Sequence, residues 1–212
     1  MKSYGQLCAV ARALDIVGDR WSLLLVRELL INGQARFTDL QIGLPGIAPN
    51  LLAQRLRDLE EHEVLRREIA APPVPGAVYR LTERGRALEG VVRELLKWGA
   101  PTVPNAPKDA TFQMHWLSLP ATYLLRDGRP QEAPVTVRFG DLRDGFDLTA
   151  GDGTVTVGIC HPDTHPTAAI TGPGPALVGL LQGAIPLDQA SKIGINITGE
   201  ISALRRILPV SN

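Results

Sequence analysis

Three prolines, Pro101, Pro104 and Pro107, interrupt the chain near its middle. Proline lacks the backbone N–H donor and disfavours the helical conformation in the residue before it, so no long helix or strand is expected to cross this stretch. The spacing of apolar residues also differs on its two sides. We therefore expect two domains, at residues 1–100 and 111–212, joined by a proline-rich linker at residues 101–110.

The first hundred residues have mainly helical periodicity. A first helix is indicated by apolar residues at the three- and four-residue spacing of a buried face, namely Leu7, Val10, Leu14 and Val17. Asp19 is placed to cap a second helix that starts near Arg20 and ends at Gly33. Thr38 is placed to cap a short helix that contains Leu40.

The next segments follow the order of a winged helix. A longer helix is expected over residues 49–63, then two strands at 64–70 and 77–82 around a proline-rich turn, and finally an amphipathic helix over 83–98. In a winged helix, three helices precede a β-hairpin, and the third helix enters the DNA major groove. The first domain is therefore expected to be a mainly α winged helix-turn-helix domain.

The outer face of the 49–63 helix carries side chains that can pair with base edges. A helical wheel places three leucines on one side and Asn50, Gln54 and Arg57 roughly opposite. Asn50 and Gln54 can pair with adenine, and Arg57 with guanine or phosphate. The other candidate DNA contacts are Arg36, Thr38, Arg55, Arg66, Arg67 and Arg80. The alternative is an ordinary solvated helix face.

A set of residues in consistent order runs through this domain: Cys8, Gly18-Asp-Arg-Trp21, Arg36-Phe37, Leu40, Gly46-Ile47, Leu52-Ala-Gln-Arg-Leu-Arg-Asp-Leu-Glu60, Val78-Tyr-Arg-Leu-Thr82, Gly85, Leu88 and Trp98. The pattern resembles the HxlR family of winged-helix transcription regulators. The resemblance implies a cytoplasmic, homodimeric DNA-binding regulator. It also implies that the third helix begins near Ala48 and that the first and last helices of the domain make the dimer contacts.

Two positions depart from the family pattern. Ala48 stands where the family usually has a hydroxyl residue that caps the third helix. The wing tip contains only proline, valine, glycine and alanine where the family often has charge, which argues against insertion of the wing into the minor groove.

Cys8 stands where several members of the family place a redox- or electrophile-sensing thiol. The alternative is a small buried hydrophobe on an apolar helix face, because only Arg12 is close enough in sequence to lower the pKa of the thiol.

The second half has the alternating pattern of strands. Strands are expected at 135–139, 146–149, 154–159, 168–171 and 195–198, and helices at 111–125, 175–182, 187–192 and 200–208. This mixture predicts an α+β domain.

The second half also resembles the sterol carrier protein fold over roughly residues 110–208, in short motifs: Ile170-Thr-Gly-Pro, Leu177-Val-Gly-Leu-Leu-Gln-Gly183, Pro186-Leu187, Ala190 and Ile195-Asn-Ile-Thr-Gly-Glu200. The resemblance implies an apolar tunnel for a small hydrophobic ligand. The candidate effector-binding residues are Phe112, Trp116, Tyr123, Phe139, Phe146, Leu177 and Leu181. The alternative is a packed core without a pocket.

Several other functions find no support in the sequence. The 212 residues are 44% hydrophobic, with 22 basic and 22 acidic side chains, as in a folded water-soluble protein. No apolar run is long enough for a membrane helix, and no secretory signal is seen, so a cytoplasmic location is expected. We expect no cofactor and no catalytic site. The segment Cys160-His-Pro-Asp-Thr-His165 has metal-competent side chains but lacks the paired spacing of zinc ligands, so no metal is expected.

These observations predict a transcription regulator that binds palindromic double-stranded DNA operators as a homodimer and senses a small apolar effector through its second domain. In the alternative, the second domain is only a structural or dimerisation platform, and the regulator responds to nothing or to redox chemistry at Cys8.

Overall fold

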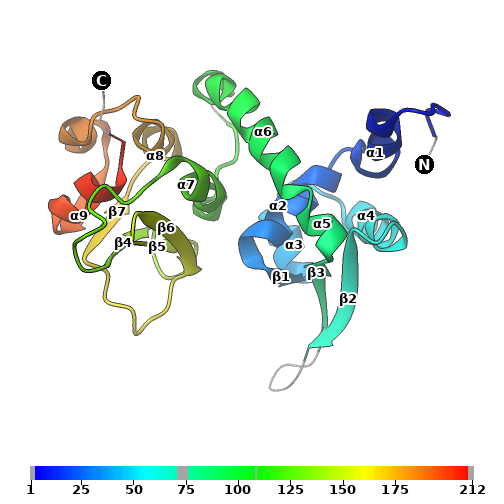
Figure 1. Ribbon diagram of the computed structural model, residues 1–212, viewed down its shortest axis with the longest axis horizontal. Helices are drawn as coiled ribbons and strands as arrows, with labels where there is room; N and C mark the ends of the chain where they lie inside the picture. Colours follow the sequence, from blue (N-terminus) through cyan, green and yellow to red (C-terminus); the bar gives the residue numbers. More distant parts are fainter. Residues whose placement is uncertain (1–2, 71–75, 108, 210–212) are drawn as a thin grey trace. The chain divides into compact units, whose positions relative to one another are not determined.

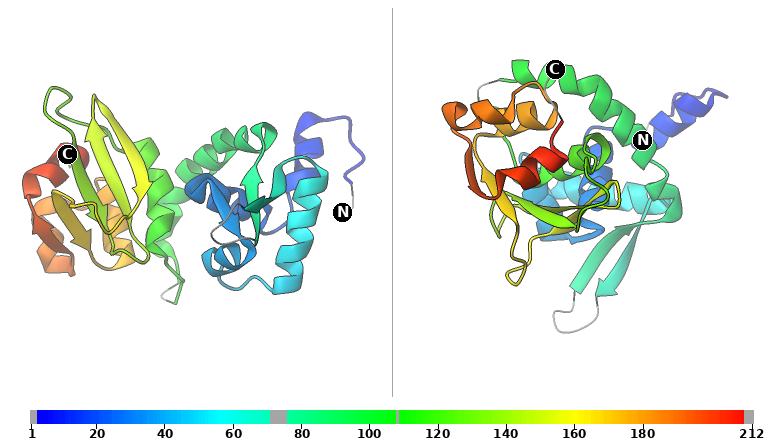
Figure 2. Two further views of the ribbon diagram at one scale, coloured as in Figure 1. Left: turned by 90° about the horizontal axis from the view of Figure 1, so that it is seen from below. Right: turned by 60° about the vertical axis from the view of Figure 1, so that its left-hand side comes forward.

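The computed structural model describes residues 3–70, 76–107 and 109–209, and the chain forms two compact units, Met1–Trp98 and Gly99–Asn212. The first unit contains the helices and strands α1 (Ala9–Val17), α2 (Ser22–Asn32), β1 (Gln34–Arg36), α3 (Phe37–Gly43), α4 (Pro49–Glu61), β2 (Leu65–Ala70), β3 (Gly76–Leu81), α5 (Glu83–Arg86) and α6 (Glu89–Gly99). Strands β2 and β3 pair as the expected antiparallel hairpin, which projects away from the helices (Figures 1 and 2). This order confirms the predicted winged helix-turn-helix fold.

The core of the first unit lies between the helices and the base of the hairpin. Leu52, Leu56 and Leu59 of α4 are each at most 2% exposed, as their spacing on the wheel predicts. Strands β2 and β3 add Leu65 and Leu81 to the same buried set. Helix α2 ends at Gly33 with φ 68, a conformation that glycine adopts without steric cost, so this predicted end is confirmed.

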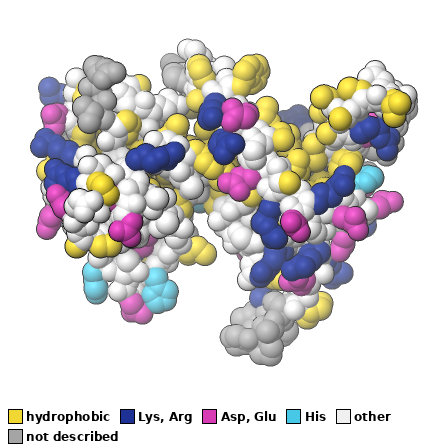
Figure 3. All heavy atoms as spheres, viewed as in Figure 1, with side chains coloured by type: hydrophobic (Ala, Val, Ile, Leu, Met, Phe, Trp, Pro, Cys, Tyr) yellow, Lys and Arg dark blue, Asp and Glu magenta, His cyan; other side chains and the backbone are white. Residues whose placement is uncertain are grey.

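The first helix differs from its expected burial. Val17 is buried, but Leu7, Val10 and Leu14 are 108%, 67% and 41% exposed, so the prediction of a buried face is wrong for these three residues. The helical spacing is correct, but these three side chains remain exposed among the residues that the structure describes. Figure 3 shows the hydrophobic side chains that α1 leaves at the surface.

Two predicted helix caps are also wrong. The carboxylate of Asp19 is engaged by Arg55 instead of capping a helix, and α2 starts at Ser22. Thr38 lies inside α3 as its second residue. The α3 start is closed by Asp39, whose carboxylate accepts a 2.9 Å hydrogen bond from the backbone N–H of Arg36.

The first unit contains one strand and one helix break that the spacing of apolar residues did not predict. Strand β1 pairs with β3 and completes a sheet of order β1-β3-β2. The single helix expected over 83–98 is divided into α5 and α6. Helix α5 is packed against the end of the hairpin, because a Cβ atom at Gly85 would lie only 1.9 Å from the carbonyl oxygen of Val64. Thr82 caps α5 by accepting a 3.0 Å hydrogen bond from the N–H of Gly85.

The second unit is an α+β structure. Its elements are the 3-10 helices η1 (Ala100–Asn105), η2 (Met114–Leu117) and η3 (Leu187–Ile193), the α-helices α7 (Ser118–Leu124), α8 (Gly174–Leu181) and α9 (Ile201–Ile207), and the strands β4 (Val135–Phe139), β5 (Phe146–Gly151), β6 (Thr154–Ile159), β7 (Ala168–Thr171) and β8 (Asn196–Gly199). The sheet order is β6-β5-β4-β7-β8, with β4 and β7 parallel and the other pairs antiparallel. Part of the proline-rich stretch forms η1, and the helix expected at 111–125 is 3-10 in its first turn.

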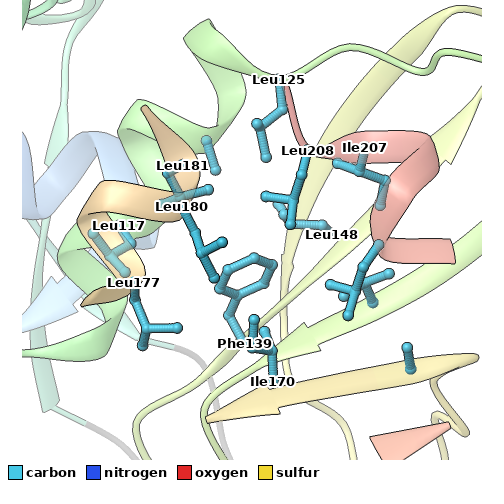
Figure 4. Close-up of a cluster of buried hydrophobic side chains, with 14 of the residues drawn as sticks. Leu117, Leu125, Phe139, Leu148, Ile170, Leu177, Leu180, Leu181, Ile207 and Leu208 are labelled. Atoms are coloured by element: carbon cyan, nitrogen blue, oxygen red, sulfur yellow. The ribbon is translucent and has the colours of Figure 1, made fainter. Parts of the chain in front are cut away.

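One hydrophobic cluster joins the helices of the second unit to its sheet. Side chains from α7, α8 and α9 converge on Phe139, Leu148 and Ile170 of the strands (Figure 4). The rings of Phe139 and Phe146 stack with centroids 5.4 Å apart.

Two buried ion pairs complete the second unit. Arg138 donates to both carboxylate oxygens of Asp147 at 2.7 and 2.8 Å, and Arg206 donates to both oxygens of Asp127 at 2.6 and 2.9 Å. Arg206 also donates to the carbonyl oxygens of Glu132 and Ala133. Bidentate geometry and extra acceptors are what make a buried ion pair tolerable. Arg138 donates in addition to the carbonyl oxygens of His161 and Thr164, so each arginine ties a loop to the core of the unit.

Candidate nucleic-acid interface

Helix α4 presents one buried and one exposed face, as the sequence predicts. It begins with Pro49, whose missing N–H costs nothing in the first turn of a helix. The preceding residue, Ala48, supplies no side-chain cap. Asn50, Gln54 and Arg57 are all exposed, on the side away from the buried leucines. The exposed face of α4 therefore offers two amides and a guanidinium to a partner.

Arg55 does not share that exposed face. Its side chain is 13% exposed, and its guanidinium forms ion pairs with Asp19 and, at 2.8 Å, with Asp58. Both carboxylates contact the same nitrogen atom, Nη1, of the guanidinium, and a contact of Arg55 with DNA phosphates stays a prediction. Sequence reasoning could not find Asp19 as the partner, since it lies in a different element.

Three arginines lie on the hairpin strands. In the register of the sheet, Arg66 is opposite Arg80, and Arg67 is opposite Tyr79. Since side chains alternate across a strand, Arg66 and Arg80 share one face and Arg67 lies on the other. Figure 3 shows the basic side chains gathered over this part of the unit.

The face that carries Arg66 and Arg80 also contains an acidic residue. Glu68 contacts Arg66 at 2.5 Å and Arg80 at 3.8 Å. On the far side of β3, the guanidinium of Arg80 donates to the amide oxygen of Gln34 in β1. We call Gln34, Arg66, Glu68 and Arg80 the wing face. Gln34 and Glu68 were not among the expected site residues, because their roles depend on the pairing of strands.

The remaining expected DNA contacts lie around α3 and the wing tip. Thr38 is exposed, and Arg36 is partly buried beside Gly76, where a Cβ atom would lie 3.1 Å from its guanidinium nitrogen. The wing tip, residues 71–75, lies outside the described residues, so the expectation about minor-groove insertion stays a prediction.

Cys8 differs from the buried alternative. Its thiol is exposed and lies immediately before α1. The backbone N–H groups of Ala11 and Val10, in the first turn of that helix, lower the pKa of Cys8 below its ordinary value. Arg12, the neighbour suggested by the sequence, instead pairs with Asp15 at 3.2 Å.

The expected effector-binding residues fall into two groups. Phe139, Phe146, Leu177 and Leu181 are at most 3% exposed and belong to the core cluster of the second unit. The other group lies nearer the surface: Phe112 is 37% exposed, and Trp116 and Tyr123 are partly buried. The ring of Phe112 covers the start of α8, because a Cβ atom at Gly174 would lie 2.5 Å from its Cγ atom.

The Cys160–His165 segment does not assemble a metal site among the described residues. Cys160 is buried with its sulfur 3.5 Å from the carboxylate of Asp147, and burial raises the pKa of the thiol to about 11. His161 and His165 are exposed. Among the helices that the structure describes, none is long and apolar enough to cross a membrane.

Comparison with known proteins shows which proteins the chain is similar to. The HxlR-like helix-turn-helix family matches residues 16–106. The uncharacterized HTH-type transcriptional regulator YvaP of Bacillus subtilis is 38% identical over 88 residues, which are 41% of this chain and 80% of that protein. The HTH-type transcriptional regulator YodB of the same organism is 34% identical over 86 residues, 41% of this chain and 76% of that protein. The solved structure of the redox regulator HypR in its reduced form is 32% identical and covers 45% of this chain and 94% of that one, with a TM-score of 0.42. On the matches to the family model, to YvaP and to YodB, the chain belongs to the HxlR-like helix-turn-helix family.

Proposed function

We propose that the protein is a DNA-binding transcription regulator of the HxlR type. The observation that carries this proposal is the exposed face of α4, where Asn50, Gln54 and Arg57 project away from a fully buried leucine face. Two relatives, 38% and 34% identical over 88 and 86 residues, carry the name HTH-type transcriptional regulator. In this proposal α4 enters the major groove and reads base edges.

The arginines outside α4 have a different role in this proposal. Arg66, Arg67 and Arg80 lie on the hairpin, and Arg36 lies on β1, opposite Val78 of the hairpin. Guanidinium groups at such positions neutralise backbone phosphates, which orients a protein on DNA without reading its sequence. Thr38, at the start of α3, adds a hydroxyl donor for a phosphate oxygen.

Replacing Arg57 tests the assignment of α4. If Arg57 contacts a base, Arg57→Ala should weaken binding to a preferred duplex by about 1 to 3 kcal/mol and leave binding to unrelated duplexes nearly unchanged. The preferred duplex is one enriched from a random pool by the wild-type protein. Arg143→Ala, which removes an exposed arginine of the second unit, is the control.

The outcome separates three cases. If Arg57→Ala weakened binding to all duplexes equally, Arg57 would be assigned to a phosphate contact instead of a base contact. Binding by the wild-type protein that does not depend on salt concentration would contradict the proposed function, because phosphate neutralisation releases counterions.

The regulator is further proposed to bind palindromic operators as a homodimer. Helix α1 and the residues before it expose Leu7, Val10 and Leu14, and α6 exposes Val91, Leu95 and Trp98. Apolar surface of this extent is typical of an interface. A two-fold dimer would place two α4 helices about one turn of DNA apart, roughly 34 Å.

For the second unit we propose a sensing role toward a small apolar effector. Its support is the sterol carrier protein-like sequence pattern over roughly residues 110–208. Phe112, Trp116 and Tyr123 are nearer the surface than the core residues and would meet an entering ligand first. The effector should shift operator affinity by about 1 to 3 kcal/mol. Deleting residues 101–212 should abolish that response while operator binding persists.

A second candidate function is redox sensing at Cys8. The specific observation in its favour is an exposed thiol whose pKa is lowered by the first turn of α1. If the truncated protein still responded to an oxidant, and Cys8→Ser abolished that response, the sensor would lie in the first unit and the second unit would be a structural platform.

A further inference from the structure

The turn between α1 and α2 contacts the α4 segment at two separate points. The turn consists of Gly18, Asp19, Arg20 and Trp21. Asp19 forms an ion pair with Arg55, which lies in the middle of α4. The ring of Trp21 lies against Gly46, in the loop that leads into α4, where a Cβ atom would lie 3.9 Å from the tip of the indole. One short turn therefore touches both the entry and the middle of the helix.

The backbone of this turn is unusual at Trp21. The φ angle of Trp21 is 84°, in the left-handed region that large side chains rarely adopt. A hydrogen bond of 3.2 Å from the N–H of Ser22 to the carbonyl oxygen of Asp19 closes the turn, and the guanidinium of Arg20 lies 5.5 Å from the Trp21 ring. A conformation of this kind persists only where its surroundings hold it in place. The contacts of Trp21 and Asp19 are such surroundings.

The two carboxylates on Arg55 are not equivalent. Asp58 lies three residues further along α4, so its ion pair with Arg55 stays within one helix. Asp19 belongs to another element, so its ion pair fixes the position of α4 relative to the α1–α2 turn. The Arg55 side chain is 13% exposed and the Asp19 side chain 36% exposed, so water screens this partly buried contact less than it screens a fully exposed ion pair.

We propose that Asp19 is a positioning residue that acts through Arg55 to hold α4 in the orientation needed to read DNA sequence. The inference rests on the proposed function, since α4 is the helix assigned to base contacts. Asp19 itself touches no base. Its removal should change how well α4 distinguishes sequences, while the phosphate contacts made by the hairpin persist. If α1 moved, the ion pair between Asp19 and Arg55 would transmit that movement to α4, because the turn follows α1 directly.

The test compares Asp19→Asn with Asp58→Asn in the full chain. Both variants remove one negative charge and one carboxylate from the same guanidinium, so they have the same effect on net charge and long-range attraction to DNA. Affinity is measured for the duplex that the wild-type protein enriches from a random pool and for a scrambled duplex of equal length. Amide hydrogen exchange over residues 44–61 is measured without DNA. Asp19→Glu, which keeps the charge, is the rescue variant.

For Asp19→Asn we expect the ratio of the two affinities to fall about tenfold, the effect of losing one base contact. Affinity for the scrambled duplex should stay within about twofold of wild type. Exchange over residues 44–61 should rise more than in Asp58→Asn, and Asp19→Glu should restore most of the ratio. Equal ratios and equal exchange for the two Asn variants would overturn the positioning role.

The measurements also separate this inference from the proposed function. If the wild-type protein enriches no sequence, the proposed function fails, and the exchange comparison still tests whether Asp19 holds α4. Equal exchange in both Asn variants would then remove the positioning role as well.

Discussion

The two cysteines carry the same side chain in opposite surroundings. Cys8 is exposed at the first turn of α1, whose N–H groups stabilise the thiolate and lower its pKa. Cys160 is buried beside Asp147, and burial raises its pKa to about 11. One of the two interpretations of the sequence predicts that Cys8 is buried. That interpretation is wrong, because the spacing of apolar residues along a helix does not reveal which of its faces is covered by another element.

Selective alkylation should follow from this difference. At pH 8 iodoacetamide should modify Cys8 in the folded protein and leave Cys160 unmodified, because the reagent attacks the thiolate. The rate at Cys8 should rise with a midpoint below 9.0, its ordinary pKa. Peptide mass mapping over a pH series measures both rates. Labelling of Cys160 before unfolding would contradict the assigned burial.

The buried ion pair of Asp127 should make the second unit sensitive to acid. Hydrogen bonds from Arg206 hold the pKa of Asp127 well below its ordinary 3.8. The stabilisation that depends on the charged carboxylate is therefore present above pH 3.8 and is lost as the pH falls below that value toward the folded-state pKa. Asp127→Asn should lower the melting temperature at pH 7, and its difference from wild type should shrink in acid.

Thermal unfolding followed by circular dichroism between pH 7 and strongly acidic pH measures that difference. Asp163→Asn, which alters a carboxylate that is 91% exposed, is the control and should change little at any pH. A gap between wild type and Asp127→Asn that stays constant as the pH falls would contradict the assignment.

The elements of the fold could largely be read from the sequence, and the exceptions have physical causes. Strands β4 and β6 have the predicted bounds, because alternation of apolar and polar residues is a local signal. Strand β1 has only three residues and exists because β3 pairs with it, so no local pattern marks it. The division between α5 and α6 falls at residues 87–88, alanine and leucine, which are good helix formers.

The sequence could predict only those residues of the candidate site whose exposure depends on the periodicity of a single helix. Asn50, Gln54 and Arg57 follow from the wheel of α4, and the structure leaves them exposed. Arg55 is adjacent to them in sequence, but its partner Asp19 comes from another element, so its ion pair could not be foreseen. The same holds for Glu68, whose position beside Arg80 depends on the register of the hairpin.

The wing face predicts a variant with increased affinity for DNA. Glu68 neutralises part of the charge of Arg66 and Arg80, so Glu68→Gln should remove the competing carboxylate and leave more of that positive charge for phosphates, while Arg80 keeps its hydrogen bond to Gln34. Affinity should rise about threefold on all duplexes alike, with a steeper dependence on salt. Glu94→Gln makes the same charge change on α6, where Glu94 pairs with Arg93 and Lys97, and it serves as the control. An increase of equal size for Glu94→Gln would assign the effect to net charge alone.

At the scale of the whole molecule, the exposed apolar residues of α1 and α6 predict self-association. Leu95→Glu should place a charge in the proposed interface and convert the dimer into a monomer. Analytical ultracentrifugation at micromolar concentration measures the mass. Ile159→Glu is the control, because Ile159 is 80% exposed in the second unit and lies outside the proposed interface. A wild-type protein that sediments as a monomer would remove the dimer from the proposed function.

The parallel pairing of β4 with β7 affects when each unit can fold during synthesis. Val137 pairs with Ala168, so the whole β5–β6 hairpin is made before β4 can meet its second neighbour. Contacts between residues so far apart in sequence form slowly, because a long loop must close first. The first unit precedes the second in the chain, so it leaves the ribosome first. We therefore expect the winged helix, with the proposed DNA-reading helix α4, to be complete in the nascent chain while the sheet of the second unit is still incomplete.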